Sequence, residues 1–164
     1  MGAKQRRPMT IEEGTPAPAF ALMDASGTTH TLAGYAGKDV IVYFYPRDET
    51  PGCTKEACRF RDIWDAFRTR GVVVLGVSPD SAASHATFAA NHRLPFPLLS
   101  DPDRKVMERY GAWGEKTMYG RTTMGVIRST VWIGPDGSVR KHWKRVAKAA
   151  EHPDAVLEAV ASAT

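Results

Sequence analysis

Two cysteines, Cys53 and Cys58, are the only ones in this 164-residue sequence, and they lie five positions apart. Cys53 follows Pro51 and Gly52, and proline is favoured at the first position of a helix. The free N–H groups and the dipole of a helix's first turn stabilise a thiolate, which is the nucleophilic form of cysteine. Because a free thiol is only about 3% ionised at pH 7, this placement favours a reactive Cys53.

The spacing of the two cysteines also limits how they can bond to each other. On one helix their Cα atoms would be about 8.7 Å apart, after a rise of about 7.5 Å and a rotation of about 140°. A disulfide needs Cα atoms closer than about 7 Å. Cys53 shares a helix face with Phe60 and other apolar residues, whereas Cys58 points away from that face. A disulfide between them therefore requires local unwinding, which suits a bond that is made and broken in a cycle.

Other side chains give weaker indications of chemistry. A zinc site on the two cysteines would need two further ligands, and the sequence has no other cysteine. His85 and His92 are seven positions apart on one expected helix face without a third ligand, so we expect both at the surface and no metal. Arg121 could bring a cation to an active site, but we expect it in a solvated loop.

The elements that must position the cysteines follow from hydrophobic patterning. Continuous apolar runs predict buried strands, and helical periodicity with capping residues predicts helices between them. Asp101 is expected to cap a helix with Pro102 at its first position and Gly111 at its end. The expected order is strand 39–46, helix from about 54 to 70, strand 72–78, helix 80–93, strand 95–101, helix 102–111, a hairpin over 125–143 around residues 134–137, and helix 151–163. This pattern predicts an α/β fold with a central mixed sheet flanked by helices.

Length and composition fit one globular domain without a membrane span. The sequence also lacks an apolar signal segment, so we expect a cytoplasmic protein with a flexible basic tail at residues 1–9 and a single domain at residues 10–164. The net charge of +4 is concentrated in that tail and in a basic strip at residues 140–148. The strip could suggest a nucleic-acid surface, but we expect a solvated strand and turn, because nothing else resembles a nucleic-acid module.

The segment YFYPRDETPGCTKEACRFRD, residues 43–62, resembles the active site of Q-type peroxiredoxins, the bacterioferritin comigratory protein group. Pro46, Thr50 and Cys53 have the P-x-x-x-T-x-x-C spacing of peroxiredoxins, and a second cysteine five residues later is typical of this subgroup. The segments GTPAPAFAL, PFPLLSDPDRKVMERYGAWGEK and GVIRSTVWIGPDGSV also resemble the family, so the similarity covers most of the chain from about Thr10 onward.

The resemblance implies a thioredoxin-like fold and a thiol peroxidase that needs no metal or bound cofactor. It matches Cys53 to the peroxidatic cysteine and Cys58 to the resolving cysteine. Pro46, Thr50 and Arg128 match the residues that frame the peroxide. The implied cycle reduces hydrogen peroxide or organic hydroperoxides to leave a sulfenic acid on Cys53, condenses it with Cys58 to a disulfide, and uses thioredoxin or a similar dithiol to restore both thiols.

These residue types suit that chemistry on physical grounds as well. A guanidinium beside the sulfur stabilises negative charge on both the thiolate and the departing oxygen. Two other hypotheses use the same cysteine pair, namely a thiol-disulfide oxidoreductase and a non-enzymatic redox sensor. The C-x-x-C spacing typical of the oxidoreductases is absent. Resolution within one chain needs no partner subunit, so we expect a monomer.

Overall fold

Strand β3 (Asp39–Phe44) is an interior strand whose unbroken run of β-branched and aromatic residues is buried on both faces of the sheet. Val40, Val42 and Phe44 pack into one hydrophobic cluster, and Ile41 and Tyr43 pack into the other. This alternation follows from the two-residue repeat of side chains along a strand. The sequence prediction of a strand buried on both faces is confirmed, and this strand leads directly into the cysteine segment.

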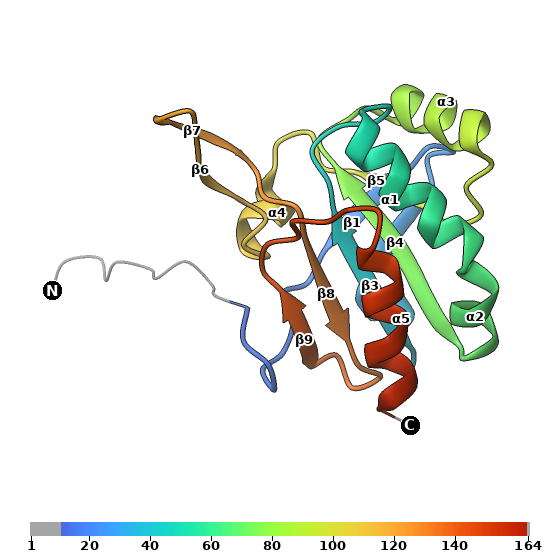
Figure 1. Ribbon diagram of the computed structural model, residues 1–164. Coiled ribbons are helices and arrows are strands. Elements are labelled where there is room, and N and C mark those ends of the chain that lie inside the picture. Colours follow the sequence, from blue (N-terminus) through green and yellow to red (C-terminus); the bar gives the residue numbers. More distant parts are fainter. Residues whose placement is uncertain (1–10, 164) are drawn as a thin grey trace, which may run out of the picture.

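A seven-stranded mixed sheet forms the centre of the computed structural model, which describes residues 11–163 (Figure 1). The strand order is β2-β1-β5-β4-β3-β8-β9. Strands β3, β4 and β5 run parallel to one another, and the other pairings in the sheet are antiparallel. Besides β3, the strands are β1 (Ala21–Asp24), β2 (Thr29–Thr31), β4 (Val72–Ser78), β5 (Leu98–Ser100), β8 (Ser129–Ile133) and β9 (Val139–Trp143).

Helices cover the two faces of this sheet unequally. Side chains from four helices join the cluster that contains Ile41 and Tyr43, whereas the short helix α4 (Lys105–Arg109) joins the opposite cluster. The four are α1 (Pro51–Asp62), α2 (Trp64–Thr69), α3 (Ala82–His92) and α5 (His152–Ser162), and a short 3-10 helix spans Ala33–Tyr35. The predicted α/β architecture with a mixed sheet between helices is therefore confirmed (Figure 1).

Three helix boundaries differ from the sequence prediction. Helix α1 begins at Pro51 rather than near residue 54. Thr50 has extended backbone angles at the N-cap position, and the chain is helical from the next residue onward. Ile63 then interrupts the expected single helix, so that α2 is a separate element. Helix α4 begins at Lys105 with Arg104 at its N-cap, so the predicted start at Asp101 and Pro102 is wrong, although Asp101 accepts a hydrogen bond from the Met107 amide at 2.8 Å.

A second hairpin was not expected from the sequence. Strands β6 (Trp113–Met118) and β7 (Arg121–Val126) pair only with each other and extend beyond the main sheet (Figure 1). Most of β7 is exposed on both faces, so its sequence lacks the apolar alternation that marks a half-buried strand. Arg121 is exposed, as expected, but it begins β7 instead of lying in a loop.

Two predictions concern the ends of the chain and its relation to membranes. The basic tail at residues 1–9 lies outside the described residues, so it stays a prediction. Within residues 11–163, no helix is long and apolar enough to span a bilayer.

Candidate active site

Cys53 lies in the first turn of α1 and is 1% exposed. Thr50 occupies the N-cap position with extended backbone angles, and its carbonyl accepts the first helical hydrogen bond, from the Thr54 amide at 2.8 Å. Proline at position 51 has no N–H to satisfy, which suits the first helical position. The amides of Gly52 and Cys53 come too early in the helix to reach an acceptor within it. The positive end of α1 is therefore directed at the Cys53 thiol.

Arg128 connects the sulfur to a second side chain of the same helix. Its Nη2 atom donates to Cys53 Sγ at 3.2 Å, and its Nη1 atom donates to Glu56 Oε1 at 2.6 Å. Burial by itself would lower the pKa of Arg128, but the charges of Glu56 and Cys53 raise it above its ordinary value. The guanidinium therefore stays charged and donates from Nη1 and Nη2 at the same time in one planar arrangement, which a lysine could not do.

The position of Arg128 depends on two backbone features. Its carbonyl accepts a hydrogen bond from the Val146 amide at 2.9 Å, which fixes the connection between β7 and β8. Its guanidinium lies against Gly52, where a Cβ atom would be only 3.3 Å from Nη2. The glycine before the cysteine therefore allows the cation to approach the start of the helix.

Glu56 is fully buried below the guanidinium, and its Oε2 atom has no hydrogen-bond partner among the described residues. Burial raises the pKa of Glu56 to about 7, although the charge and hydrogen bond of Arg128 act in the opposite direction. The carboxyl group consequently exchanges its proton near neutral pH. When it is ionised, it neutralises part of the positive charge that Arg128 presents to Cys53.

Aromatic side chains from β3 and α1 pack in the hydrophobic cluster that contains Cys53. The ring of Tyr43 stacks on Phe60 with ring centroids 4.6 Å apart, and both rings share a hydrophobic cluster with Cys53. Burial and the nearby charges of Glu56 and Cys53 raise the pKa of Tyr43, so its hydroxyl is neutral. Water is thus excluded from this side of the sulfur, which strengthens its electrostatic interaction with Arg128.

Pro46 and Thr50 belong to the loop between β3 and α1. Pro46 ends the strand, because it cannot donate to the ladder, and it lines a small cavity of about 230 Å³ together with Arg128. The Thr50 hydroxyl donates to the Arg47 carbonyl at 2.8 Å and makes no capping bond to the helix. The lone pairs of this hydroxyl therefore remain able to accept a hydrogen bond from a peroxide.

Cys58 is partly exposed and lies on the same continuous helix as Cys53. Both thiols are free. Since α1 is intact from Pro51 to Asp62, the helix geometry keeps the two Cα atoms about 8.7 Å apart. The structure therefore brings Cys53 and Arg128 together but leaves Cys58 out of bonding range.

A buried contact between Asp48 and His85 holds the loop that contains Pro46 and Thr50. Asp48 Oδ2 lies 2.7 Å from His85 Nδ1, and the other ring nitrogen, Nε2, lies 3.0 Å from the Leu99 carbonyl. The Tyr45 hydroxyl donates to Asp48 Oδ1 at 2.6 Å, and the Ser84 hydroxyl donates to Oδ2 at 2.7 Å. Both ring nitrogens of His85 face acceptor oxygens, so the imidazole connects the loop to β5.

The surface location expected for His85 is wrong, because this side chain is 0% exposed. The helix periodicity did not reveal that the loop before α1 supplies an acidic partner. His92 is half-buried and binds Glu49 Oε1 at 2.8 Å, so α3 contacts the loop at two successive acidic residues. Glu49 itself has a positive φ of 65°, a conformation that these contacts help to hold.

Asp48, Asp80 and His85 have the residue types and proximity of a metal site, since one ligand atom of each lies within 4.8 Å of the others. Their atoms are already used, however. Asp80 Oδ2 accepts from the Ser78 hydroxyl at 2.7 Å and from the Asp48 amide at 2.8 Å. The cluster is therefore a hydrogen-bond network that holds the loop in place.

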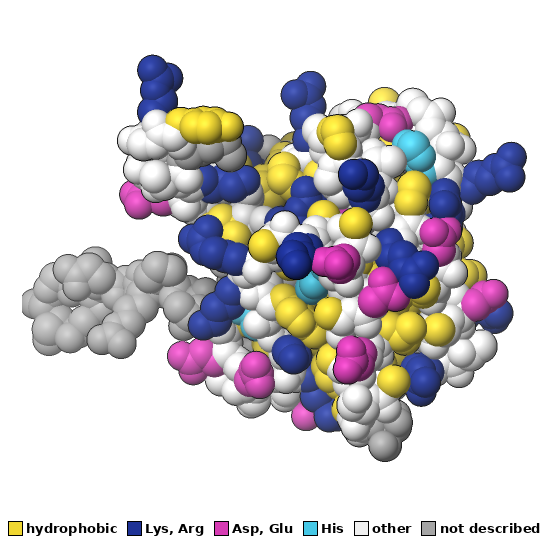
Figure 2. All heavy atoms as spheres, viewed as in Figure 1, with side chains coloured by type: hydrophobic (Ala, Val, Ile, Leu, Met, Phe, Trp, Pro, Cys, Tyr) yellow, Lys and Arg dark blue, Asp and Glu magenta, His cyan; other side chains and the backbone are white. Residues whose placement is uncertain are grey.

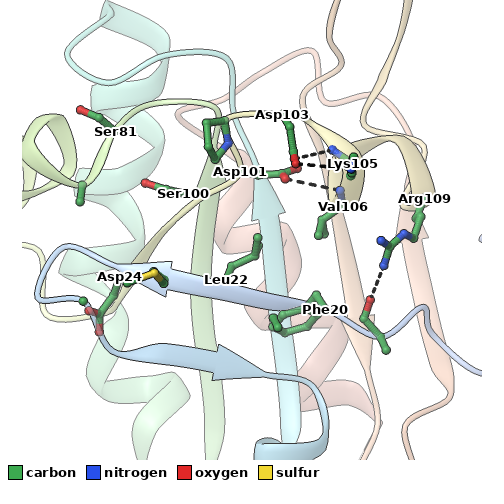
Figure 3. A pocket seen from close by; sticks show the side chains of 16 residues that line it. Phe20, Leu22, Asp24, Ser81, Ser100, Asp101, Asp103, Lys105, Val106 and Arg109 are labelled. Carbon is green, nitrogen blue, oxygen red and sulfur yellow. Dashed lines mark hydrogen bonds and ion pairs between the residues drawn. The ribbon is translucent and has the colours of Figure 1, made fainter.

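A larger cavity of about 810 Å³ lies on the opposite face of the sheet, between β1, β5 and α4 (Figure 3). Its apolar lining includes Phe20, Leu22 and Val106, which belong to the hydrophobic cluster on the opposite side of the sheet from the cluster that contains Cys53. Two of its polar side chains already make hydrogen bonds, because Asp101 accepts from the Met107 amide and Arg109 donates to the Ala19 carbonyl at 3.1 Å. None of the candidate catalytic residues selected from the sequence lines this cavity.

Sequence reasoning missed Glu56, Asp48 and His85 as parts of the site. Glu56 could have been found, because it lies three residues after Cys53 and four before Phe60 and so must share their buried helix face. The pairing of Asp48 with His85 could not, since 37 residues separate them.

Comparisons with known proteins agree with this geometry. The family model described as the AhpC/TSA family matches residues 14–142. A Mycobacterium tuberculosis protein named as a peroxiredoxin is 56% identical over 129 residues, which cover 79% of this chain and 82% of the relative. The peroxiredoxin Bcp of Bacillus subtilis is 43% identical over 150 residues, which cover 92% and 95% of the two chains. The structure is similar to the Xanthomonas campestris bacterioferritin comigratory protein, studied for alkyl peroxide reduction, with a TM-score of 0.86, 38% identity and coverage of 93% and 99%.

Proposed function

Because the chain belongs to the AhpC/TSA family and is a thioredoxin-like thiol peroxidase of the Bcp peroxiredoxin type, we propose that Cys53 is its peroxidatic cysteine. The observation that carries this assignment is the contact of 3.2 Å between Arg128 Nη2 and Cys53 Sγ. The start of α1 and the guanidinium both place positive charge beside this sulfur. Within residues 11–163 no guanidinium donates a hydrogen bond to the Cys58 thiol, although the charge of Arg61 interacts with it through space.

The proposed first step is attack of the Cys53 thiolate on the terminal oxygen of a hydroperoxide. A sulfur–oxygen bond forms, the O–O bond breaks, and the electron pair leaves on the departing oxygen, which takes a proton to give water or an alcohol. Cys53 becomes a sulfenic acid. Arg128 stabilises the negative charge as it moves from sulfur to oxygen, and Thr50 can accept a hydrogen bond from the bound peroxide.

The proposed second step is condensation of this sulfenic acid with the Cys58 thiol, which releases water and forms an intramolecular disulfide. It requires the first turns of α1 to unwind, because the helix holds the two cysteines out of bonding range. Glu56 supports such unwinding, since its buried Oε2 lacks a partner and would gain water when the turn opens. Each chain contains both cysteines, so a monomer is sufficient for the cycle.

The proposed third step is reduction of the disulfide by thioredoxin or a similar dithiol. Hydrogen peroxide and small alkyl hydroperoxides are the proposed substrates. The alkyl substrates are supported by the alkyl peroxide reduction studied in the Xanthomonas campestris relative. The small cavity beside Arg128 is consistent with substrates of this size.

The test is peroxide-dependent oxidation of NADPH with thioredoxin and thioredoxin reductase, for the unmodified protein and the variants Cys53→Ser and Cys58→Ser. We expect Cys53→Ser to abolish turnover. We expect Cys58→Ser to consume one equivalent of peroxide and then to recycle poorly. If Cys53→Ser retains turnover, or if Cys58→Ser recycles as fast as the unmodified protein, the corresponding assignment is wrong.

A further inference from the structure

The small cavity beside Arg128 contains two more cations that the proposed cycle does not use. It is lined by six residues, namely Pro46, Lys116, Ile127, Arg128, Arg145 and Val146. Arg128 is neutralised by Glu56, but neither Lys116 nor Arg145 makes an ion pair or a side-chain hydrogen bond within residues 11–163. No carboxylate lines the cavity. Its rim therefore presents two uncompensated positive charges next to the guanidinium that contacts Cys53.

The fold brings these two cations together from distant parts of the chain. Lys116 lies on β6, in the protruding hairpin, opposite Thr123 on β7. Its side chain crosses Gly125, where a Cβ atom would lie 2.9 Å from Lys116 Cδ, so the glycine leaves space for the lysine stem. Arg145 follows β9 and precedes Val146, whose amide binds the Arg128 carbonyl. Figure 2 shows basic side chains gathered beside the hairpin on this face.

We propose that Lys116 and Arg145 are specificity residues that bind the carboxylate of small hydroperoxides with an acid group on or near the peroxide-bearing carbon. This inference rests on the proposed function of Cys53. Two cations that converge on one concave surface raise the local concentration of an anion there and bind it together. Cys53 does not itself line this cavity, but the peroxide group of the same molecule would face Arg128, whose Nη2 atom contacts Cys53 Sγ, while Pro46, Ile127 and Val146 contact its alkyl groups.

The size of the cavity limits the substrate to short molecules. A volume of about 230 Å³ is below the range of about 300–1,000 Å³ that is usual for drug-sized ligands. The reaction keeps the balance given above, because the acid group takes no part in it. Attack of the Cys53 thiolate on the terminal peroxide oxygen leaves a sulfenic acid on Cys53 and releases a hydroxy acid as the second product.

Two matched probes can separate charge recognition from peroxide reduction. The neutral probe is tert-butyl hydroperoxide, and the anionic probe is 2-hydroperoxy-2-methylpropanoate, in which one methyl group is replaced by a carboxylate. The measured quantity is the ratio of kcat/KM for the anionic probe to kcat/KM for the neutral probe. We expect the double variant Lys116→Gln/Arg145→Gln to lower this ratio by about tenfold, because charge-assisted hydrogen bonds are lost. The ratio in the unmodified protein should also fall as salt is added.

The control variant is Arg121→Gln/Lys144→Gln, which removes one cation from the same hairpin and one from the same loop as the test variant. Neither control residue lines the cavity, and the change in net charge is identical. We expect the control to keep the ratio of the unmodified protein. The proposal is overturned if the test variant also keeps that ratio, or if the control lowers it equally. Failure of the unmodified protein to reduce either probe would instead overturn the proposed peroxidase cycle, and this inference with it.

Discussion

Arg128 Nη2 lies 3.2 Å from Cys53 Sγ, although 75 residues separate them in the chain. The same guanidinium binds Glu56 one helical turn further along α1. One cation therefore links the Cys53 sulfur to a buried acid, and substitutions around it should separate effects on activity from effects on stability.

The first prediction concerns the two-pronged contact of Arg128. In Arg128→Lys the charge is retained, but an ammonium group cannot reach Cys53 and Glu56 in one planar arrangement. We expect kcat/KM for hydrogen peroxide to fall about 10²-fold, a size typical of a lost charge-stabilising donor. Stopped-flow measurement of one peroxide turnover checks this value. Arg121→Lys is the control and should react at the unmodified rate, because Arg121 is exposed on β7.

Substitution of Gly52 should lower activity without lowering stability. In Gly52→Ala the new methyl group would lie 3.3 Å from Arg128 Nη2 and displace the guanidinium. We expect the rate of peroxide reduction to fall at least several-fold. Alanine favours helix over glycine by about 0.5–1 kcal/mol, so the free energy of unfolding should not decrease. A parallel loss of rate and stability, measured by urea denaturation, would contradict this explanation.

Glu56 should make stability depend on pH near neutrality. Its pKa is about 7 in the folded protein and ordinarily 4.5, so between these values the folded state holds a proton that the unfolded state has lost. The free energy of unfolding contributed by this group therefore decreases as pH rises from 4.5 to 7. Glu56→Gln keeps an acceptor for Arg128 and removes the titration. The variant should gain up to about 3 kcal/mol relative to the unmodified protein between pH 4.5 and pH 8.

Urea denaturation of both proteins at several pH values measures this difference. We also expect peroxide-driven disulfide formation at pH 8 to be slower in Glu56→Gln, because unwinding α1 no longer releases a buried charge. A difference in unfolding free energy that is constant with pH would show that Glu56 ionises normally.

His152 should destabilise the protein in mild acid. Burial, aided by the positive charge of Arg128, lowers the pKa of His152 from 6.5 to about 4, and its Nε2 atom lies 2.8 Å from Thr130 Oγ1. Between pH 6.5 and pH 4 the unfolded state binds a proton that the folded state does not. Stability is therefore lost as pH falls through this window, by up to about 3 kcal/mol. His152→Gln should lack this component, so its urea-denaturation curve should lose less stability than that of the unmodified protein. Parallel losses would rule out His152 as the cause.

Asp48 and His85 should behave as a coupled pair. Asp48→Asn removes the carboxylate that lies 2.7 Å from the buried His85 Nδ1, and leaving a buried polar group without its partner costs about 1–3 kcal/mol. The double variant Asp48→Asn/His85→Gln should be less destabilised than the sum of the two single variants, because it removes both members of the contact together. A double-mutant cycle of unfolding free energies measures the coupling. Additive effects would mean that the two side chains are not energetically coupled.

Several features of the fold were determined by the sequence itself. The buried runs of β3 and β4 are continuous in the chain, so hydrophobic patterning located both strands. The cap of α3 was also local, since Ser81 accepts from the Ser84 amide. The β6–β7 hairpin was missed because it makes no pairing with the main sheet, and therefore carries little of the apolar pattern by which strands are recognised.

The sequence by itself determined the spacing of the cysteine segment, because Pro51, Gly52, Cys53 and Cys58 lie in one helix, whose geometry fixes their separation. Only the tertiary structure decided which charges surround that segment. Lys116, Arg128 and Arg145 converge on one cavity through strand pairing and a loop contact. Such convergence depends on how separate elements pack, and no local pattern of residues encodes it.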